Sequence, residues 1–288
     1  MSRTPLGHTL PDFPWNSLAD AKKKAQAHPD GIVDLSVGNP VDPVAPGVQL
    51  ALSAAAEAPG YPQTQGTPEL REAIAKALQR RYNMNVDAVL PVIGTKEAIA
   101  WLPTLLGMRG ETVAFPTVAY PTYEVGALLA GAKPLRADED FQDASLVFIN
   151  SPSNPTGKVL GVEKLREIVA WARANNAIVA SDECYMGLGW DDENPPVSIL
   201  DPRVTDGDNT GLIACIRCPR ARTWPPTARA SSQAMPSSSP SCWNCASTQG
   251  LSFQAPFRRP WLPRLTTTPP KPSSANATPR AVWISCGR

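Results

Sequence analysis

Three residues at the start of a predicted helix have the chemistry of an anion site. Gly94, Thr95 and Lys96 follow the apolar run "VLPVI" and open a helical pattern over residues 96–107. A glycine turn, a hydroxyl and the free backbone N–H groups of a helix N-terminus together suit a phosphate. The same residues also fit a plain turn with a helix cap. The segment is therefore a candidate phosphate site.

Polar and aromatic residues follow three other apolar runs. Tyr120 and Tyr123 come after "TVAFP", and either ring could stack on a flat ligand or simply pack in the core. Asn154 lies in the turn "SPSNPTG", where its amide could face a ligand or form an Asx-turn. Asp182 follows "AIVA", and a carboxylate at such a place usually has a cationic partner or a ligand.

The elements that carry these residues alternate between strands and helices. This alternation predicts an α/β fold, with a mostly parallel sheet covered by helices on both faces. Ligands bind at the carboxyl ends of the strands in such sheets, where the residues above are expected. Strands are predicted at 89–94, 112–116, 132–137, 145–150, 177–183 and 211–214, and helices at 17–28, 68–83, 96–107, 120–131 and 162–176.

Charge divides the 288 residues into two unlike parts. The stretch 215–288, called the tail below, holds nine Arg, one Lys and no Asp or Glu, whereas the first 214 residues hold 17 basic and 26 acidic residues. Five of the 6 cysteines are in the tail. The single earlier cysteine, Cys184, fits a reducing cytoplasm. Neither a secretory leader nor an apolar run of roughly 18 residues is present, so we expect a cytoplasmic protein.

Six segments, taken in order, resemble a known family. They are "DLSVGNPVD", "YPQTQGTPELREAIA", "GTKEAIA", "AYPTYE", "NSPSNPTG" and "SDECY". Over about residues 10–214 the chain resembles the fold-type-I pyridoxal-phosphate aminotransferases of class I/II. The segments "LPDFPWNSLADAKKKA" and "DGIVDLSVGNPVDPV" are most similar to the succinyldiaminopimelate transaminases of actinobacteria. The resemblance implies amino transfer between N-succinyl-2-amino-6-oxopimelate and glutamate, in lysine biosynthesis.

The resemblance also implies the roles of individual residues toward pyridoxal 5′-phosphate. Asp182 would pair with the protonated ring nitrogen and make the ring an electron sink. Asn154 and Tyr185 would hydrogen-bond its 3′-oxygen, and Tyr120 would stack on the ring. The phosphate would be held by the segment Gly94, Thr95 and Lys96.

Three further residues are implied on the substrate and partner sides. Gly38 and Asn39 would line the substrate side of the site. Tyr61 would reach the phosphate of the partner subunit's cofactor, which implies a homodimer with shared sites. A tyrosine in the surface turn "GYPQTQG" is the alternative for Tyr61.

The family's cofactor-binding lysine is missing. The resemblance places it after the strand "GLIA", near Pro219 and Arg220, but the tail's single lysine is Lys271, in "TPPKPSS". The lysine is essential because it holds the cofactor and moves the proton. As written, the chain is therefore predicted to be inactive.

A shift of reading frame near Ala214 explains the loss. Codons built from the last nucleotide of one codon and the first two of the next allow "HSLSKxSNLASYRAGF", the family's motif with its lysine and an arginine eight residues later. Several of these codons permit a single amino acid; Trp224/Pro225, for example, forces Ala. We therefore predict three regions: 1–35 as the N-terminal segment of a small domain, 36–214 as an incomplete cofactor-binding large domain, and 215–288 as an out-of-frame, disordered tail.

Several other functions stay open. The chain could be another fold-type-I enzyme, such as an aspartate or aromatic aminotransferase or a C–S lyase, or a non-catalytic cofactor-binding remnant. The pairs Cys215/Cys218 and Cys242/Cys245 have the spacing of a zinc ribbon, and a basic tail could bind nucleic acid. The frame argument makes that spacing a coincidence, so we expect no metal and no nucleic-acid partner.

Overall fold

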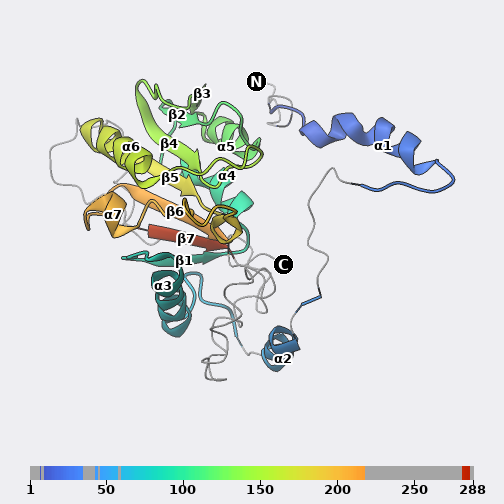
Figure 1. Cartoon of the computed structure of the whole chain (residues 1–288), viewed down its shortest axis with the longest axis horizontal. Helices are drawn as coiled ribbons and strands as arrows, with labels where there is room; N and C mark the ends of the chain where they lie inside the picture. The colour runs from blue at the N-terminus through green and yellow to red at the C-terminus, as the bar shows by residue number, and fades with distance from the viewer. Residues whose placement is uncertain are drawn as a thin grey trace, which may run out of the picture.

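Seven parallel strands form one sheet in the part of the chain that the structure describes. The computed structural model describes residues 7, 10–34, 43–44, 46–57, 60–217 and 281–285. The strand order is β1-β7-β6-β5-β4-β2-β3, and every pairing is parallel (Figure 1). The strands are β1 (Val89–Val92), β2 (Thr112–Phe115), β3 (Lys133–Arg136), β4 (Ala144–Asn150), β5 (Ile178–Asp182), β6 (Leu212–Arg217) and β7 (Ala281–Ser285). The predicted α/β fold is confirmed.

Helices connect the strands, mostly where the sequence predicts them. The α-helices are α1 (Ala19–Gln26), α2 (Pro46–Ala54), α3 (Pro68–Tyr82), α4 (Thr95–Leu105), α5 (Thr122–Ala130), α6 (Val162–Ala174) and α7 (Pro202–Thr205). Two 3-10 turns, η2 (Pro14–Leu18) and η3 (Met186–Leu188), precede α1 and follow β5. The start of α3 shows how local sequence sets a boundary: the Thr67 side chain accepts a hydrogen bond from Leu70 N–H at 3.2 Å, and Pro68 occupies the first turn.

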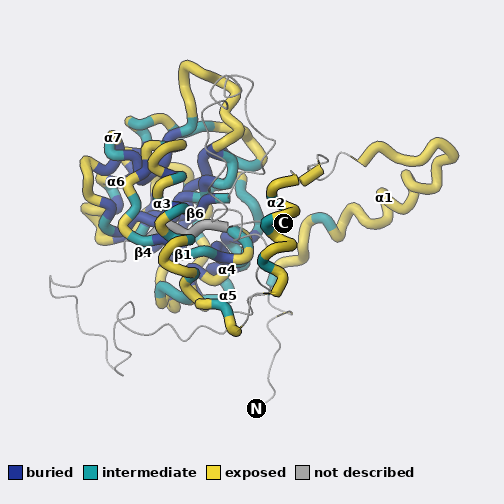
Figure 2. Tube along the Cα trace, turned by 90° about the horizontal axis from the view of Figure 1, so that it is seen from below, coloured by how far each residue is buried: buried dark blue, intermediate teal, exposed yellow. Residues whose placement is uncertain are grey.

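Both faces of the sheet are buried under helices. Side chains alternate along β4, so that Leu146 and Phe148 pack under α4 and α5 while Val147 and Ile149 pack under α3, α6 and α7. Figure 2 shows this buried layer inside the exposed outer surfaces of the helices. The helices hold the carboxyl ends of the strands at one edge of the sheet, which is where the site lies.

The strand β6 continues past Ala214, the predicted limit of the large domain. Leu212, Ala214 and Ile216 pack on one face of the sheet, and Ile213 and Cys215 pack on the other. Cys215 has 1% of its surface exposed. This position in the core leaves Cys215 unable to serve as a zinc ligand while β6 stays in the sheet; the other three cysteines of the ribbon pattern lie outside the described residues.

A short segment of the tail also joins the sheet. Residues 281–285 form β7, which lies between β1 and β6 (Figure 1). Residues 215–217 extend β6, and residues 281–285 pair beside it as β7. The expected disorder of the rest of the tail stays a prediction. The remainder of the tail, 218–280 and 286–288, lies outside the described residues.

The N-terminal helices contribute little to the core. Neither α1 nor α2 buries a side chain, and Figure 2 shows α1 exposed along its length. Apolar residues on and beside these helices are exposed, among them Val33 (84%) and Leu50 (71%). The assignment of residues 1–35 to a small domain stays a prediction. No helix in the described part of the chain is long and apolar enough to cross a membrane.

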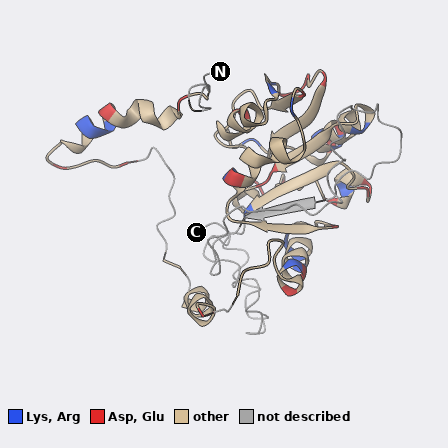
Figure 3. Ribbon diagram, turned by 180° about the vertical axis from the view of Figure 1, so that it is seen from behind, with Lys and Arg blue, Asp and Glu red and all other residues tan. Residues whose placement is uncertain are grey.

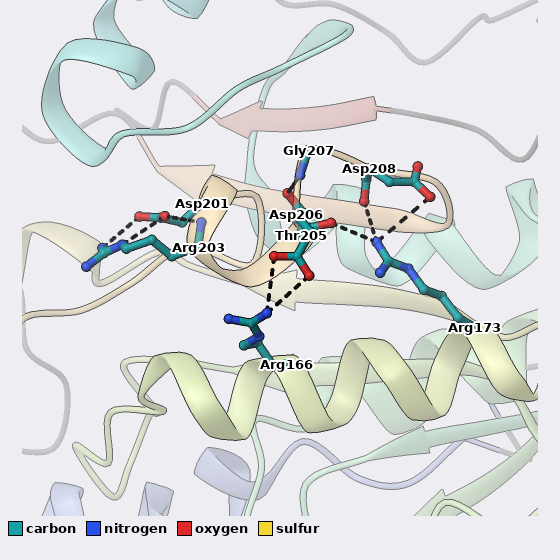
Figure 4. Close-up of polar contacts among 8 residues, drawn as sticks. All are labelled: Arg166, Arg173, Asp201, Arg203, Thr205, Asp206, Gly207 and Asp208. Atoms are coloured by element: carbon teal, nitrogen blue, oxygen red, sulfur yellow. Dashed lines mark hydrogen bonds and ion pairs between the residues drawn. The ribbon is translucent and has the colours of Figure 1, made fainter.

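Charged residues lie mostly on the helices and loops (Figure 3). One group of them fixes the approach to β6. Arg173, in the last turn of α6, donates to the carbonyl oxygens of Thr205 at 3.1 Å and Asp208 at 2.6 Å (Figure 4). Arg166, two turns earlier on the same face of α6, binds both carboxylate oxygens of Asp206 at 3.2 Å. These contacts tie α7 and the turn before β6 to α6.

Candidate active site

The carboxyl ends of β4 and β5 meet at the centre of the site. Asn150 ends β4 opposite Asp182, which ends β5. The Asn150 Nδ2 donates to the Asp182 carbonyl oxygen at 2.9 Å, and its Oδ1 accepts from Asn154 N–H at 2.7 Å. Asn150 therefore fixes the loop that carries Asn154 beside Asp182. The sequence analysis missed Asn150, although its place at the end of an apolar run was a signal.

Asp182 is held by two hydrogen bonds. The Tyr123 hydroxyl donates to Oδ2 at 2.7 Å, and the Cys184 backbone N–H donates to Oδ1 at 3.2 Å. Desolvation raises the pKa of Asp182, and the hydrogen bonds from Cys184 and Tyr123 oppose that rise. The residue remains partly exposed at the edge of the sheet. Its carboxylate is thus oriented and open to a cationic partner.

Asn154 and Tyr185 form a pair next to this carboxylate. The Asn154 Nδ2 donates to the Tyr185 hydroxyl oxygen at 3.3 Å. Desolvation raises the pKa of Tyr185, while the positive charge of Arg217 at the end of β6 opposes the rise. An amide and a protonated phenol side by side can both donate to one ligand oxygen. Arg217 lies in the tail, and the sequence analysis did not foresee a cation here.

The N-terminus of α4 lies beside the same strand ends. Gly94 is its N-cap and makes no side-chain capping bond, so the first-turn N–H groups have no capping side chain. A Cβ added to Gly94 would meet no atom within 4 Å, which shows open space at this point. The Cys184 thiol donates to the Thr95 Oγ1 at 3.1 Å and so links α4 to the loop after β5. Open space and free donors suit an anion.

The N-terminal segment packs beside two predicted residues, Lys96 and Tyr120. The Lys96 Nζ lies 5.5 Å from the centre of the Tyr120 ring and 4.8 Å from that of Phe13. Trp15 stacks on Phe13, with ring centres 5.0 Å apart, and its ring centre is 6.1 Å from that of Tyr120. The Lys96 ammonium is therefore held by aromatic faces in this structure. Phe13 and Trp15 carried no sequence signal of their own.

The remaining predicted residues are not brought into the site. Tyr61 is fully exposed, with a relative exposure of 102%. Gly38 and Asn39 lie outside the described residues, as do Pro219 and Arg220, where the missing lysine is expected.

A buried carboxyl group lies directly behind the site. Glu183 is 1% exposed, and its Oε1 accepts from Ile199 N–H at 2.8 Å. Burial raises the pKa of Glu183 to about 7. The hydrogen bond to Ile199 anchors the chain before α7.

The arrangement identifies a class of ligand and agrees with comparison to known proteins. An oriented carboxylate, a phenol–amide pair and a free helix N-terminus match a protonated ring nitrogen, an adjacent ring oxygen and a phosphate. The model of the family "aminotransferase class I and II" matches residues 30–216. The chain belongs to this aminotransferase family. Enzymes of the family depend on pyridoxal phosphate, and the donor set here fits that cofactor.

Two aminotransferase relatives match the same part of the chain. A protein of Mycobacterium tuberculosis named a probable aminotransferase is 61% identical over 221 residues, which span 74% of this chain and 52% of that protein. The 4-dedimethylamino-4-oxo-anhydrotetracycline transaminase of Streptomyces rimosus is 53% identical over 212 residues, 71% of this chain and 58% of that protein. The chain thus spans little more than half the length of these curated relatives.

Solved aminotransferases share the fold. An aminotransferase from Neisseria meningitidis aligns with a TM-score of 0.62 and 30% identity, over 72% of this chain and 59% of that one. The N-succinyldiaminopimelate aminotransferase from Mycobacterium tuberculosis aligns with a TM-score of 0.62 and 24% identity, over 74% of this chain and 59% of that one. At 24% identity the second match supports the fold alone.

Proposed function

We propose that this chain binds pyridoxal 5′-phosphate at the carboxyl edge of the sheet but does not complete amino transfer. The observation that carries the proposal is the carboxylate of Asp182, held between Tyr123 and Cys184 and flanked by the Asn154–Tyr185 pair. None of these groups needs a lysine to contact the cofactor, so the chain as written can bind the cofactor noncovalently.

Each group has a distinct task in this proposal. Asp182 holds the proton on the ring nitrogen, because a carboxylate stabilises the adjacent cation. Asn154 and Tyr185 donate to the 3′-oxygen, and the first turn of α4 binds the phosphate through Gly94, Thr95 and Lys96. When bound, the cofactor supplies an electron sink for carbon–nitrogen chemistry. Tyr120, half-buried beside Lys96, would cover a face of the ring.

The loss of catalysis follows from the missing lysine. The family match ends at residue 216, close to the proposed shift of frame at Ala214. The tail beyond it has one lysine, Lys271, in a Pro- and Ser-rich context. Without a lysine shortly after β6, where the family has it, no side chain holds the cofactor covalently or moves the proton on the substrate carbon. We therefore expect binding without turnover.

For the intact enzyme from which this chain would derive, we propose transfer of an amino group between N-succinyl-2-amino-6-oxopimelate and glutamate. The supporting observation is the similarity of the segments around residues 10–45 to the succinyldiaminopimelate transaminases. A second candidate is amination of a polycyclic ketone, which the 53% identity to the Streptomyces rimosus transaminase favours. Competition between the two ketones in a frame-restored enzyme decides between them.

The intact enzyme is proposed to be a cytoplasmic homodimer with shared sites. The full exposure of Tyr61 and the exposed apolar residues of α2, such as Leu50, support a surface that a second subunit covers. In a frame-restored protein, Tyr61→Phe should weaken cofactor binding if the subunits share their sites. Unchanged binding in a dimer would contradict sharing.

The test of cofactor binding uses pyridoxamine 5′-phosphate, which needs no lysine. We expect saturable binding by the chain as written and loss of binding in Asp182→Asn, because the neutral amide does not stabilise a ring cation. Borohydride should fix pyridoxal phosphate at no single lysine. A stoichiometric adduct at one lysine, with turnover of any amino acid, would contradict the proposed inactivity.

The test of the frame is genetic. Restoring one nucleotide near codon 214 should give a chain of family length with a lysine shortly after "GLIA". The restored protein should transfer amino groups from glutamate, and its Asp182→Ala variant should not. Stop codons soon after codon 214 in the alternative frame would contradict the shift.

A further inference from the structure

Tyr123 forms a hydrogen bond with Asp182 from a different element of the fold. It lies in the first turn of α5, whereas Asp182 ends β5, and the two are 59 residues apart in the chain. Its hydroxyl donates to Asp182 Oδ2 at 2.7 Å. The family resemblance gave Tyr123 no role, and the sequence suggested only that its ring might stack or pack.

The Tyr123 ring has little freedom to move. The residue is 1% exposed. Its ring centre lies 5.1 Å from that of Phe148 on β4 and 6.4 Å from that of Phe115 on β2. Interiors are close-packed, so a ring between two strands keeps one rotamer and presents its hydroxyl at a fixed point.

The hydroxyl is the donor in its hydrogen bond with Asp182. Desolvation and the negative charge of Asp182 raise the pKa of Tyr123 far above its usual value, so the phenol stays protonated. The group that receives this proton must offer a lone pair, which an ionised carboxylate does on each oxygen. With Cys184 N–H on Oδ1, both oxygens of Asp182 are bound, and the plane of the carboxylate is set.

Other titratable groups surround the pair. Cys184, Cys215 and Tyr185 interact electrostatically with Asp182, and burial raises the pKa of each of them, so all are neutral at pH 7. Glu183 is the neighbouring acid, and Arg217 is a cation that acts on Tyr185. Desolvation raises the pKa of Asp182, and the hydrogen bonds from Cys184 and Tyr123 lower it and so favour the carboxylate form.

We propose that Tyr123 is a positioning residue that holds Asp182 as an oriented carboxylate for the ring nitrogen of the cofactor. This inference rests on the proposed function of the site. Tyr123 does not touch the cofactor; it acts through Asp182. The α5 helix thereby takes part in recognition of the ring, in addition to the strand that carries the acid.

The test compares Tyr123→Phe with a matched control. Tyr123→Phe removes one hydroxyl and keeps the ring between Phe115 and Phe148. The control is Tyr82→Phe, because Tyr82 is a partly buried tyrosine packed against the core on the other face of the sheet. Pyridoxamine 5′-phosphate labelled with ¹⁵N in its ring is the probe, and both its affinity and its ring-nitrogen chemical shift are measured.

The expected result for Tyr123→Phe is roughly ten- to hundred-fold weaker binding at pH 7, as for loss of a hydrogen bond to a charged group. The ¹⁵N shift should move toward that of the unprotonated ring, because Asp182 becomes more basic. In the ligand-free protein, ¹³C NMR should show Asp182 titrating at higher pH than in the parent. A purely structural role would lower stability and leave both spectroscopic signals unchanged.

The outcomes separate the two proposals. Suppose that the parent binds the probe and Asp182→Asn does not. If Tyr123→Phe then matches the parent in affinity and in both NMR signals, the role of Tyr123 is overturned, but cofactor binding stands. If the parent and Asp182→Asn behave alike toward the probe, the proposed function falls, and the role of Tyr123 falls with it.

Discussion

Asn150 and Asp182 end neighbouring strands, and the amide of the first is bonded to the main chain of the second at 2.9 Å. The same amide donates to the Pro152 carbonyl oxygen at 3.2 Å and accepts from Asn154 N–H at 2.7 Å. One side chain therefore connects Asp182, the acid proposed to face the ring nitrogen, to the loop that carries Asn154, the amide proposed to bind the 3′-oxygen.

Asn150→Ala should lower the free energy of unfolding by about 2–4 kcal/mol, because it leaves buried backbone groups without partners. It should also weaken binding of pyridoxamine 5′-phosphate, since Asn154 loses its support. Urea unfolding measures the first effect, and titration with the cofactor analogue measures the second. Asn175→Ala is the control: its amide bonds the Trp171 carbonyl oxygen at an exposed helix end. A similar loss in both variants would contradict the special role of Asn150.

Gly126 sets the distance between α4 and α5. A Cβ at this position would meet the Ala100 carbonyl oxygen at 3.0 Å and the Ile99 carbonyl oxygen at 3.2 Å, which are backbone atoms. We expect Gly126→Ala to destabilise the protein by about 1–3 kcal/mol, despite the better helix propensity of alanine. Because α4 begins at the proposed phosphate site of Gly94, Thr95 and Lys96, the affinity for phosphate should fall as well.

Gly161→Ala is the matched control for this prediction. Gly161 is the N-cap of α6, has a φ of −76°, and a Cβ there would meet nothing within 4 Å. Thermal unfolding of both variants measures the difference. If Gly126→Ala is as stable as the parent, the two helices can separate without cost, and the argument from close packing is wrong.

Glu183 should make stability depend on pH. Its pKa is raised from 4.5 to about 7 in the folded chain, so between these values the folded state binds more protons than the unfolded state. The free energy of unfolding should therefore fall as pH rises through this window, by about 3 kcal/mol in all. The raised pKa of Asp182 acts in the same direction.

The measurement is the urea midpoint at a series of pH values from 4 to 8. In Glu183→Gln the slope between pH 4.5 and 7 should become clearly smaller, because no proton is exchanged at this position, and Asp182 should account for a remaining slope of the same sign. A slope equal to that of the parent would show that other groups cause it.

The sequence was a good guide to elements and a weaker guide to contacts. Helix periodicity and apolar runs predicted the order of strands and helices, because each is a local pattern. The partnership of Tyr123 with Asp182 was missed, since the two side chains are joined only when α5 packs over β2 and β4. The ring cluster of Phe13, Trp15 and Lys96 was missed for the same reason. The strand β7 was not predicted, because strand pairing depends on backbone hydrogen bonds and tolerates many side chains.

The strand from the tail, β7, pairs with β1, the strand that leads to the proposed phosphate site at the start of α4. In the described part of the chain β1 pairs with β7 and with no other strand, and β7 pairs in turn with β6. Two residues separate the end of β1 at Val92 from the start of α4 at Thr95. Deleting residues 281–288 should leave β1 without a partner, expose the edge of β6 and loosen the turn at Gly94.

We therefore expect this deletion to raise amide hydrogen exchange in β1 and at the start of α4 and to weaken binding of inorganic phosphate and of pyridoxamine 5′-phosphate. Deletion of residues 286–288 alone, which spares β7, is the control and should leave both unchanged. If loss of residues 281–285 changes neither exchange nor binding, β1 is held by its helices alone, and the tail adds nothing to the site. If exchange rises and binding persists, the cradle is formed by α4 without help from β1.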